Sequence, residues 1–262
     1  GIGRISTDMA VSLHVCCWLD IMMLTRLARS RSDDAAAFYE SRAGQRAAFL
    51  LNRRLRAVMP SLTARRILGV GYTHPYLPGS ASFAVSGRLQ TPQTQRLSPI
   101  ERILPDCIIE SNRLPFDDLS MDAVMVVHGL EFARSVPDFL RAVWRVMTDD
   151  GCLILVTPNR SGAWAHTDAT PFGHGSPFST NQLARVLGQG MFRIERHTGA
   201  LMAPPIFLNT SNGTIPERLG RATGYPLAGV HVVLARKNAD AGLPLLEEGV
   251  RAPISRQIAE PA

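Results

Sequence analysis

The feature that most constrains the fold is a pair of short, uninterrupted apolar runs in the middle of the chain, Ala123 to Val127 and Cys152 to Val156. Runs of this length without alternation are typical of strands that are buried on both faces of a sheet. A helical pattern separates them, with Ser135 as its N-cap, Pro137 in its first turn and apolar residues at helical spacing as far as Met147. The order strand, helix, strand predicts a βαβ unit and a parallel sheet.

Other segments continue this alternation on both sides of the central unit. We predict a helical stretch that begins after Asp34 and ends at Pro60, and another helix after Ser179, which forms a capping box with Gln182. The predicted strands cover 66–70, 82–85, 107–109, 123–127, 152–156, 192–198 and 231–235. We therefore expect an α/β fold, a doubly wound and mainly parallel seven-stranded sheet with helices on both faces. Such sheets bind ligands at the carboxyl ends of their strands, here after Val70, after Val85, around Glu110 and after Val127.

Length and composition favour one large domain, because 262 residues with 45% hydrophobic side chains can bury a sizeable core. Met22 or Met23 is a candidate start, so residues 1–22 are set aside as a non-native or disordered extension. The domain is expected to cover 23–237 and to include a proline-rich lid or insertion at about 199–228. Residues 238–262 are expected to form a flexible tail.

Charge and cysteine content narrow the possible partners and the compartment. The formal net charge is +6, but the arginines are spread along the chain without interleaved aromatic residues, which favours a solvated helix face over nucleic-acid binding. The four cysteines show no zinc spacing, so we predict no metal site, free thiols and a cytoplasmic location. No apolar run reaches the roughly 18 residues that a membrane span requires.

Several motifs in the middle of the chain resemble the class I S-adenosylmethionine-dependent methyltransferases, in the type 11-like subgroup that modifies small molecules. The stretch Leu114 to Asp122 resembles the family's LPFxDxSFD segment, and His128 to Phe132 resembles its HxLEH motif. Trp144 to Leu153 is similar to RVLxPGGxL, and Thr157 to Asn159 matches the end of the fifth strand. The resemblance implies methyl transfer from S-adenosylmethionine to a small-molecule acceptor.

The first loop of the family, acidic-x-G-x-G-x-G, is altered in this chain. Gly69 stands at the acidic position and only Gly71 of the three glycines remains, followed by Tyr72, Thr73, His74 and Pro75. A side chain at these positions takes up room that glycine leaves for the amino-acid end of the donor. The second predicted strand also offers no carboxylate for the ribose of the donor. The donor-binding loop is therefore degenerate.

By resemblance, the cofactor-binding residues are Gly69, Gly71, Tyr72, Glu110 and His128. Each of them also has a structural interpretation, for Gly71 a strand-to-helix turn and for Glu110 an exposed carboxylate. His128 and His174 are the catalytic candidates, because histidine can accept a proton from a hydroxyl or amine near neutral pH. Both can equally be fixed by packing or by hydrogen bonds to the backbone.

Three further side chains leave two interpretations open. Glu131 either faces a cationic donor or caps the loop that follows. Trp164 and His166 either line an acceptor pocket or close the edge of the core.

Three functional hypotheses follow, of which a small-molecule methyltransferase is preferred. The second is a catalytically inactive methyltransferase-like binding protein, which the altered loop favours. The third is a nicotinamide-dependent oxidoreductase, but Gly69 to His74 lacks the third glycine of GxGxxG and no acid follows nearby. Methylation of RNA is a variant of the first hypothesis and predicts binding that weakens steeply with salt.

Overall fold

A computed structural model describes residues 35–59, 65–77, 83–89, 106–168, 170–205 and 228–238. The predicted extension, the tail beyond 238, the loop from Gln90 to Arg102 and most of the predicted lid lie outside these residues. In the described part of the chain, no helix is both long and apolar enough to cross a membrane.

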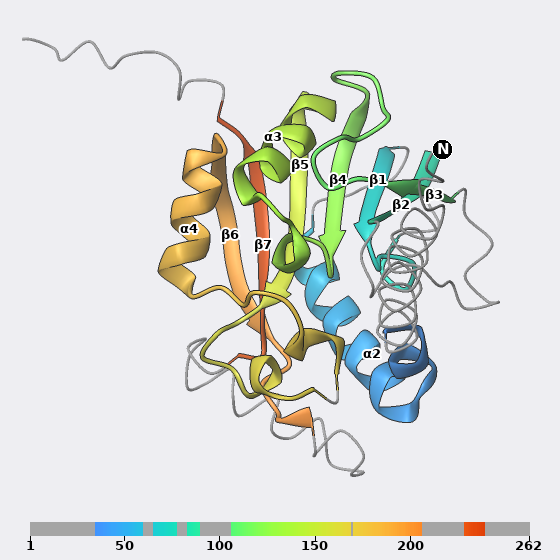
Figure 1. The fold of residues 1–262 in the computed structure, drawn as a ribbon, viewed down its shortest axis with the longest axis vertical. Helices are drawn as coiled ribbons and strands as arrows, with labels where there is room; N and C mark the ends of the chain where they lie inside the picture. The colour runs from blue at the N-terminus through green and yellow to red at the C-terminus, as the bar shows by residue number, and fades with distance from the viewer. Residues whose placement is uncertain are drawn as a thin grey trace, which may run out of the picture.

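A seven-stranded sheet forms the centre of the molecule, with the order β3-β2-β1-β4-β5-β7-β6 (Figure 1). The strands β1, β2, β3, β4 and β5 pair in parallel, whereas β7 is antiparallel to both of its neighbours. The expected doubly wound, mainly parallel sheet is confirmed. The strands are β1 Arg66–Gly71, β2 Phe83–Leu89, β3 Asp106–Ile109, β4 Met121–Val127, β5 Met147–Pro158, β6 Phe192–Ala200 and β7 Val230–Lys237.

Helices cover both faces of the sheet. Side chains of successive strand residues point to opposite sides, so an uninterrupted apolar strand presents an apolar surface on each face. Ala123, Met125 and Val127 of β4 pack with α2 in one core, and Val124 and Val126 pack with α3 and α4 in the other. The α-helices are α2 Arg42–Val58, α3 Val136–Val146 and α4 Thr180–Gln189, and the short 3₁₀ helices are η2 Leu130–Phe132, η3 Ala163–His166 and η4 Pro171–Gly173.

Side-chain N-caps begin α2, α3 and α4, at α3 and α4 where the sequence predicts them. Ser135 Oγ accepts a hydrogen bond from Asp138 N at the start of α3, and Ser179 Oγ accepts one from Gln182 N at the start of α4. At α2, Ser41 Oγ accepts a hydrogen bond from Gly44 N. Each cap satisfies one of the backbone donors that a helix leaves free in its first turn.

Two predicted boundaries are wrong. The second strand does not end at Val85 but continues to Leu89, so the ligand-binding rim at this strand lies four residues further on. The stop signal at Asp149 to Gly151 falls inside β5, because the helix already ends at Val146 and pairing with β4 begins at Met147. The pairing of β4 with β5 then shifts in register between Met121 and Ala123, and this irregularity accommodates the polar residues Asp149 and Asp150 within β5.

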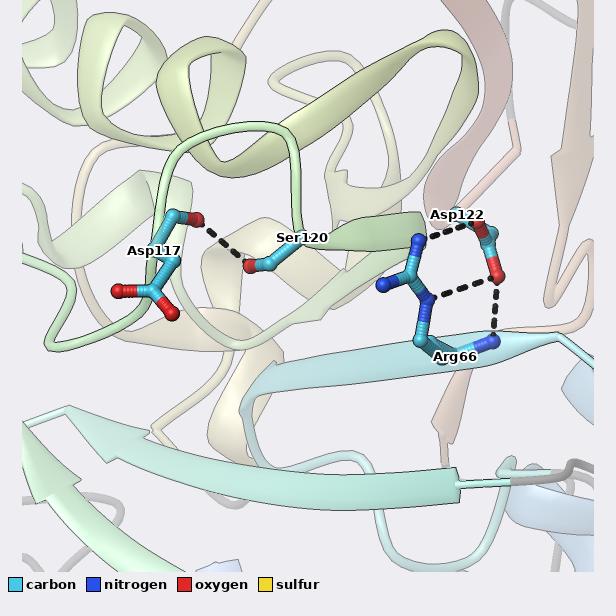
Figure 2. A network of polar contacts seen from close by, with 4 residues as sticks. All are labelled: Arg66, Asp117, Ser120 and Asp122. Atoms are coloured by element: carbon cyan, nitrogen blue, oxygen red, sulfur yellow. Dashed lines mark hydrogen bonds and ion pairs between the residues drawn. The ribbon is translucent and has the colours of Figure 1, made fainter.

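At the amino-terminal ends of the central strands, a polar network joins β1 to β4 (Figure 2). Asp122 accepts a hydrogen bond from the backbone N of Arg66 at 2.8 Å and forms an ion pair with its guanidinium at 3.1 Å. Partial burial raises the pKa of Asp122, but the hydrogen bonds from Arg66 outweigh burial and the net shift is downward. Nearby, Ser120 Oγ donates to the carbonyl of Asp117. This network lies at the end of the strands away from the ligand-binding rim and is structural.

A pair of histidines links β6, β7 and the loop before α4. His231 Nε2 donates to the carbonyl of Phe178 at 3.0 Å, so its Nδ1 accepts a hydrogen bond from His197 Nε2, also at 3.0 Å. Burial lowers the pKa of His231 to about 4, and burial also lowers the pKa of His197. Both imidazoles are therefore neutral in the folded protein near pH 7.

This pair predicts a loss of stability in mild acid. Between pH 6.5, the ordinary pKa, and about pH 4, the unfolded chain binds a proton at His231 that the folded chain does not. The free energy of unfolding should therefore fall as the pH falls through this window, by roughly 2–3 kcal/mol from His231. Urea unfolding at pH 7 and pH 4.5 measures the difference. It should shrink in His231→Gln and persist in the exposed control His166→Gln; equal pH dependence in His231→Gln and the wild type would contradict the assignment.

Candidate active site

The carboxyl ends of β1 and β4 meet around a buried aromatic cluster, which we define as Tyr39, Tyr72, Tyr76, His128 and Phe172. Tyr72 and Tyr76 come from the loop after β1, His128 follows β4, and Phe172 lies in η4. Tyr39 comes from the helical residues 35–40 that precede α2. Figure 1 shows that the segment after β5, which includes η3 and η4, lies at this same end of the sheet.

The loop after β1 folds back on the sheet and uses both of its glycines for that purpose. Gly71 has a φ of 89°, and a Cβ there would lie 2.1 Å from the carbonyl oxygen of Val127. A Cβ at Gly69 would lie 2.1 Å from Thr73 Oγ1, so the Thr73 side chain fills the space beside that glycine. Gly71 is needed for a turn that only glycine adopts readily, and for close approach to β4. The two glycines do not form an open cradle.

The rings of Tyr72 and Tyr39 are stacked, with centroids 4.8 Å apart and planes inclined by 9°. Tyr72 is 2% exposed and Thr73 is fully buried. Two side chains of the altered donor loop are therefore buried at the carboxyl ends of β1 and β4, where a doubly wound sheet has its ligand-binding crevice.

A chain of hydrogen bonds runs through the cluster to His128. Tyr76 donates its hydroxyl to the hydroxyl of Tyr39 at 3.1 Å, and Tyr39 is hydrogen-bonded to His128 Nε2 at 2.8 Å. Burial raises the pKa of both tyrosines well above the ordinary value, and Glu131 adds to the rise at Tyr39. Both phenols are therefore protonated at neutral pH. The Tyr39 proton can be donated to His128, which leaves His128 Nδ1 as the donor on the side of Glu131.

His128 has the left-handed backbone φ of 53° and is fully buried. Its Nδ1 lies 3.4 Å from Glu131 Oε1, and both side chains have no exposed surface. Within the described part of the chain, neither carboxyl oxygen of Glu131 accepts a hydrogen bond, and His128 Nδ1 makes none. The predicted capping role of Glu131 is therefore not observed. Buried, unpartnered polar atoms beside a strained residue at a strand end are typical of functional sites.

The loop that contains His174 lies against Glu131. Ser176 N donates to the carbonyl of Glu131 at 2.9 Å, and a Cβ at Gly175 would lie 2.7 Å from the same oxygen. His174 Nε2 is buried without a hydrogen-bond partner among the described residues, as is the hydroxyl of Thr170. His128 and His174 thus lie in segments that contact the same residue, Glu131.

Of the other predicted site residues, Glu110 is exposed and forms an isolated bridge with Arg113 beyond the end of β3. Trp164 is 1% exposed and donates from Nε1 to the carbonyl of Ala203 at 2.8 Å, which supports its structural interpretation. His166 Nε2 is hydrogen-bonded to the carbonyl of Arg160. No motif in the sequence singles out Tyr39 or Tyr76, and the one signal for Tyr39 is its place in the helical stretch before the first strand.

A separate cavity of about 450 Å³ lies on the exposed face of α2. Its lining includes Phe49, Arg53, Arg56 and Pro75 but neither His128 nor Glu131. It is not part of the crevice. Elsewhere in the described residues, no group of three His, Cys, Asp or Glu side chains could hold a metal ion.

Comparison with known proteins defines the class of this fold. Residues 91–155 match the family described as a methyltransferase domain. A S-adenosylmethionine-dependent methyltransferase of Thermotoga maritima, described as a possible histamine N-methyltransferase, is similar in structure, with a TM-score of 0.56 and 16% identity over 74% of this chain and 91% of that chain. A comparison with curated protein sequences found no match.

Two more solved structures show the same likeness. The complex of the Trm112 methyltransferase activator with a methyltransferase of Haloferax volcanii matches with a TM-score of 0.56 and 12% identity, over 79% of this chain and 98% of that chain. A S-adenosylmethionine-dependent methyltransferase of Archaeoglobus fulgidus matches with a TM-score of 0.51 and 15% identity, over 72% and 94%. The predicted resemblance to class I methyltransferases is confirmed, and S-adenosylmethionine is the implied methyl donor.

The described residues fit this donor in one respect and not in another. S-adenosylmethionine carries a sulfonium and an ammonium, and the buried carboxyl group of Glu131, which accepts no hydrogen bond from the described residues, suits such a charge. The loop after β1 does not fit, because Tyr72 and Thr73 fill the place that glycines leave open in the family. The donor can therefore reach the crevice only where side chains of the cluster move.

Proposed function

We propose that the protein transfers a methyl group from S-adenosylmethionine to a small-molecule acceptor. The match to a methyltransferase domain and the strand order support methyl transfer in general. The observation that carries the proposal to this site is the buried pair of Glu131 and His128 at the carboxyl end of β4, in which neither the Glu131 carboxyl oxygens nor His128 Nδ1 makes a hydrogen bond to the described residues. This is the place where a doubly wound sheet binds its ligand.

When bound, the donor supplies a methyl group already activated on a sulfonium, so the protein need only orient the acceptor and exclude water. The aromatic cluster excludes water from this end of the sheet, since Tyr39, Tyr72 and Tyr76 are almost completely buried. His128 and His174 are the candidates to accept a proton from an acceptor hydroxyl or amine. Four further residues are predicted donor contacts by resemblance alone: Gly69, Gly71, Tyr72 and Glu110.

The acceptor class and the compartment belong to the same proposal. A small molecule is favoured over nucleic acid because the arginines are not accompanied by stacking aromatic residues. A reducing, cytoplasmic compartment is supported by the buried thiol of Cys152 within the described chain.

A direct test is the formation of S-adenosylhomocysteine, measured by mass spectrometry, from the purified full-length protein, S-adenosylmethionine and a panel of small amines, alcohols and phenols. We expect formation that depends on one class of acceptor and falls by about 10²–10⁴-fold in His128→Ala if that histidine is the general base. Turnover that is equal in the wild type and in His128→Ala with every acceptor would contradict the role of His128.

The second candidate function is a methyltransferase-like binding protein without catalytic activity. It is favoured by one observation, the stacking of Tyr72 on Tyr39 inside the crevice. In that case no acceptor yields S-adenosylhomocysteine, and saturating donor leaves the melting temperature of the protein unchanged.

A further inference from the structure

Glu131 is the least satisfied charged group in the described core. Its side chain has no exposed surface, and neither of its carboxyl oxygens accepts a hydrogen bond from the described residues. Burial of a carboxyl group without such partners is costly, because the group loses its hydration without compensation. Among the described residues, its one ion-pair contact is with His128 Nδ1, 3.4 Å from Oε1, and this atom also makes no hydrogen bond. The carboxyl group is therefore able to pair with a positive charge brought by a ligand.

The surroundings of Glu131 suit an organic cation better than a metal ion. His128, which faces Glu131, has the ring of Phe172 4.4 Å away and the ring of Tyr39 5.9 Å away, centroid to centroid. Aromatic faces attract sulfonium and substituted ammonium ions, which are large and weakly hydrated. No other carboxyl or thiol of the described chain joins Glu131 and His128 to make a metal site.

Tyr39 contacts the other side of His128, the residue that faces Glu131. Its hydroxyl is held by Tyr76 and His128, and its ring is stacked on Tyr72. The residue belongs to helical residues 35–40, which are separated from α2 by the single bend residue Ser41. A ligand that enters past His128 must replace the contacts of Tyr39, so its apparent affinity is reduced by the fraction of molecules in which Tyr39 has moved away.

We propose that Glu131 anchors a small organic cation, a sulfonium or a substituted ammonium, and that Tyr39 is the cover that this cation displaces. The proposal rests on the proposed function where the cation belongs to S-adenosylmethionine or to an amine acceptor. The two sources share one chemistry, a positive charge spread over carbon-bearing substituents, and binding experiments separate them.

The test is calorimetric titration of the full-length protein and its Glu131→Gln variant with two matched pairs of ligands. S-adenosylmethionine is compared with S-adenosylhomocysteine, which lacks the sulfonium charge, and choline with its neutral isostere 3,3-dimethyl-1-butanol. We expect Glu131→Gln to weaken the cation of at least one pair by about tenfold and its neutral counterpart by less than about threefold. An effect on S-adenosylmethionine identifies the donor as the source, and an effect on choline identifies an ammonium ligand.

Two further variants keep the proposal open to refutation. Tyr39→Ala removes the cover and should raise the affinity for the same cation by about fivefold or more, whereas Tyr39→Phe retains the ring and removes only the hydroxyl, and should raise it less. Equal affinities of wild type and Glu131→Gln for all four ligands would overturn the proposal, and so would an unchanged affinity in Tyr39→Ala. Choline binding that requires Glu131, in a protein that does not bind S-adenosylmethionine, would support the cation site and contradict the proposed methyl transfer.

Discussion

Replacement of Gly71 by alanine should lower the free energy of unfolding by about 3–5 kcal/mol. The φ of 89° is unfavourable for any residue with a side chain. The added Cβ would lie 2.1 Å from the carbonyl oxygen of Val127 and 2.8 Å from that of His128, and both atoms belong to the backbone of the next segment. Backbone atoms in the middle of a close-packed sheet cannot move away without loss of pairing elsewhere. Urea unfolding followed by circular dichroism measures the effect.

A matched control is Gly188→Ala in α4, where an added Cβ meets nothing within 4 Å. This variant should be as stable as the wild type or more stable by up to about 1 kcal/mol, because alanine favours the helix. The difference between the two variants separates the two interpretations of Gly71, a residue of the turn after β1 and a contact of the donor. A Gly71→Ala protein with wild-type stability and weakened donor binding would show that this glycine serves the ligand and not the turn.

Replacement of Trp164 by alanine should lower the free energy of unfolding by about 3–5 kcal/mol. The indole is 1% exposed, lies 5.4 Å from the ring of Phe172 between centroids, and donates a hydrogen bond to Ala203. The backbone of Gly229 packs directly on it, since a Cβ there would lie 2.2 Å from the indole Cδ1. Alanine would leave a large cavity and an unpartnered carbonyl, both of which are destabilising.

Two variants provide the comparison in the same unfolding experiment. Trp164→Phe retains a ring and loses only the hydrogen bond and part of the volume, and should cost about 1–2 kcal/mol. Phe49→Ala removes an aromatic ring that is 64% exposed, and should change stability by less than about 0.5 kcal/mol. If Trp164→Ala were as stable as the wild type, the structural role of Trp164 would be contradicted. The other interpretation of the sequence, that Trp164 lines an acceptor pocket, would then be favoured.

The sequence is most informative where burial alone decides the structure. The apolar runs at Ala123 to Val127 and Cys152 to Val156 are strands at the centre of the sheet, and the N-caps Ser135 and Ser179 begin the helices that cover it. These features depend on local chemistry and on hydrophobic burial, which a single sequence displays directly. The ends of β2 and β5 were less predictable, because polar residues continue those strands and pairing with a neighbour, not composition, sets the boundary.

The position of the candidate site could be predicted from the sequence, but most of the side chains that form it could not. The rim after β1 and β4 follows from topology, and His128 lies there as expected. The contribution of Tyr39 could not be seen, because it lies 89 residues from His128 in the sequence and meets it only in the folded chain. The close approach of Gly71 to Val127 of β4 also depends on a contact between segments that no local pattern reveals.

The central claim is that this methyltransferase fold admits S-adenosylmethionine at the crevice that Tyr39 and Tyr72 fill in the structure. Equilibrium titration of the wild-type protein with S-adenosylmethionine, followed by the near-ultraviolet circular dichroism of its tyrosines, tests it most directly. We predict saturable binding accompanied by a change in the tyrosine signal as the stacked rings separate, and neither should occur with adenosine alone. An unchanged signal and no binding at millimolar donor would show that the crevice is permanently closed.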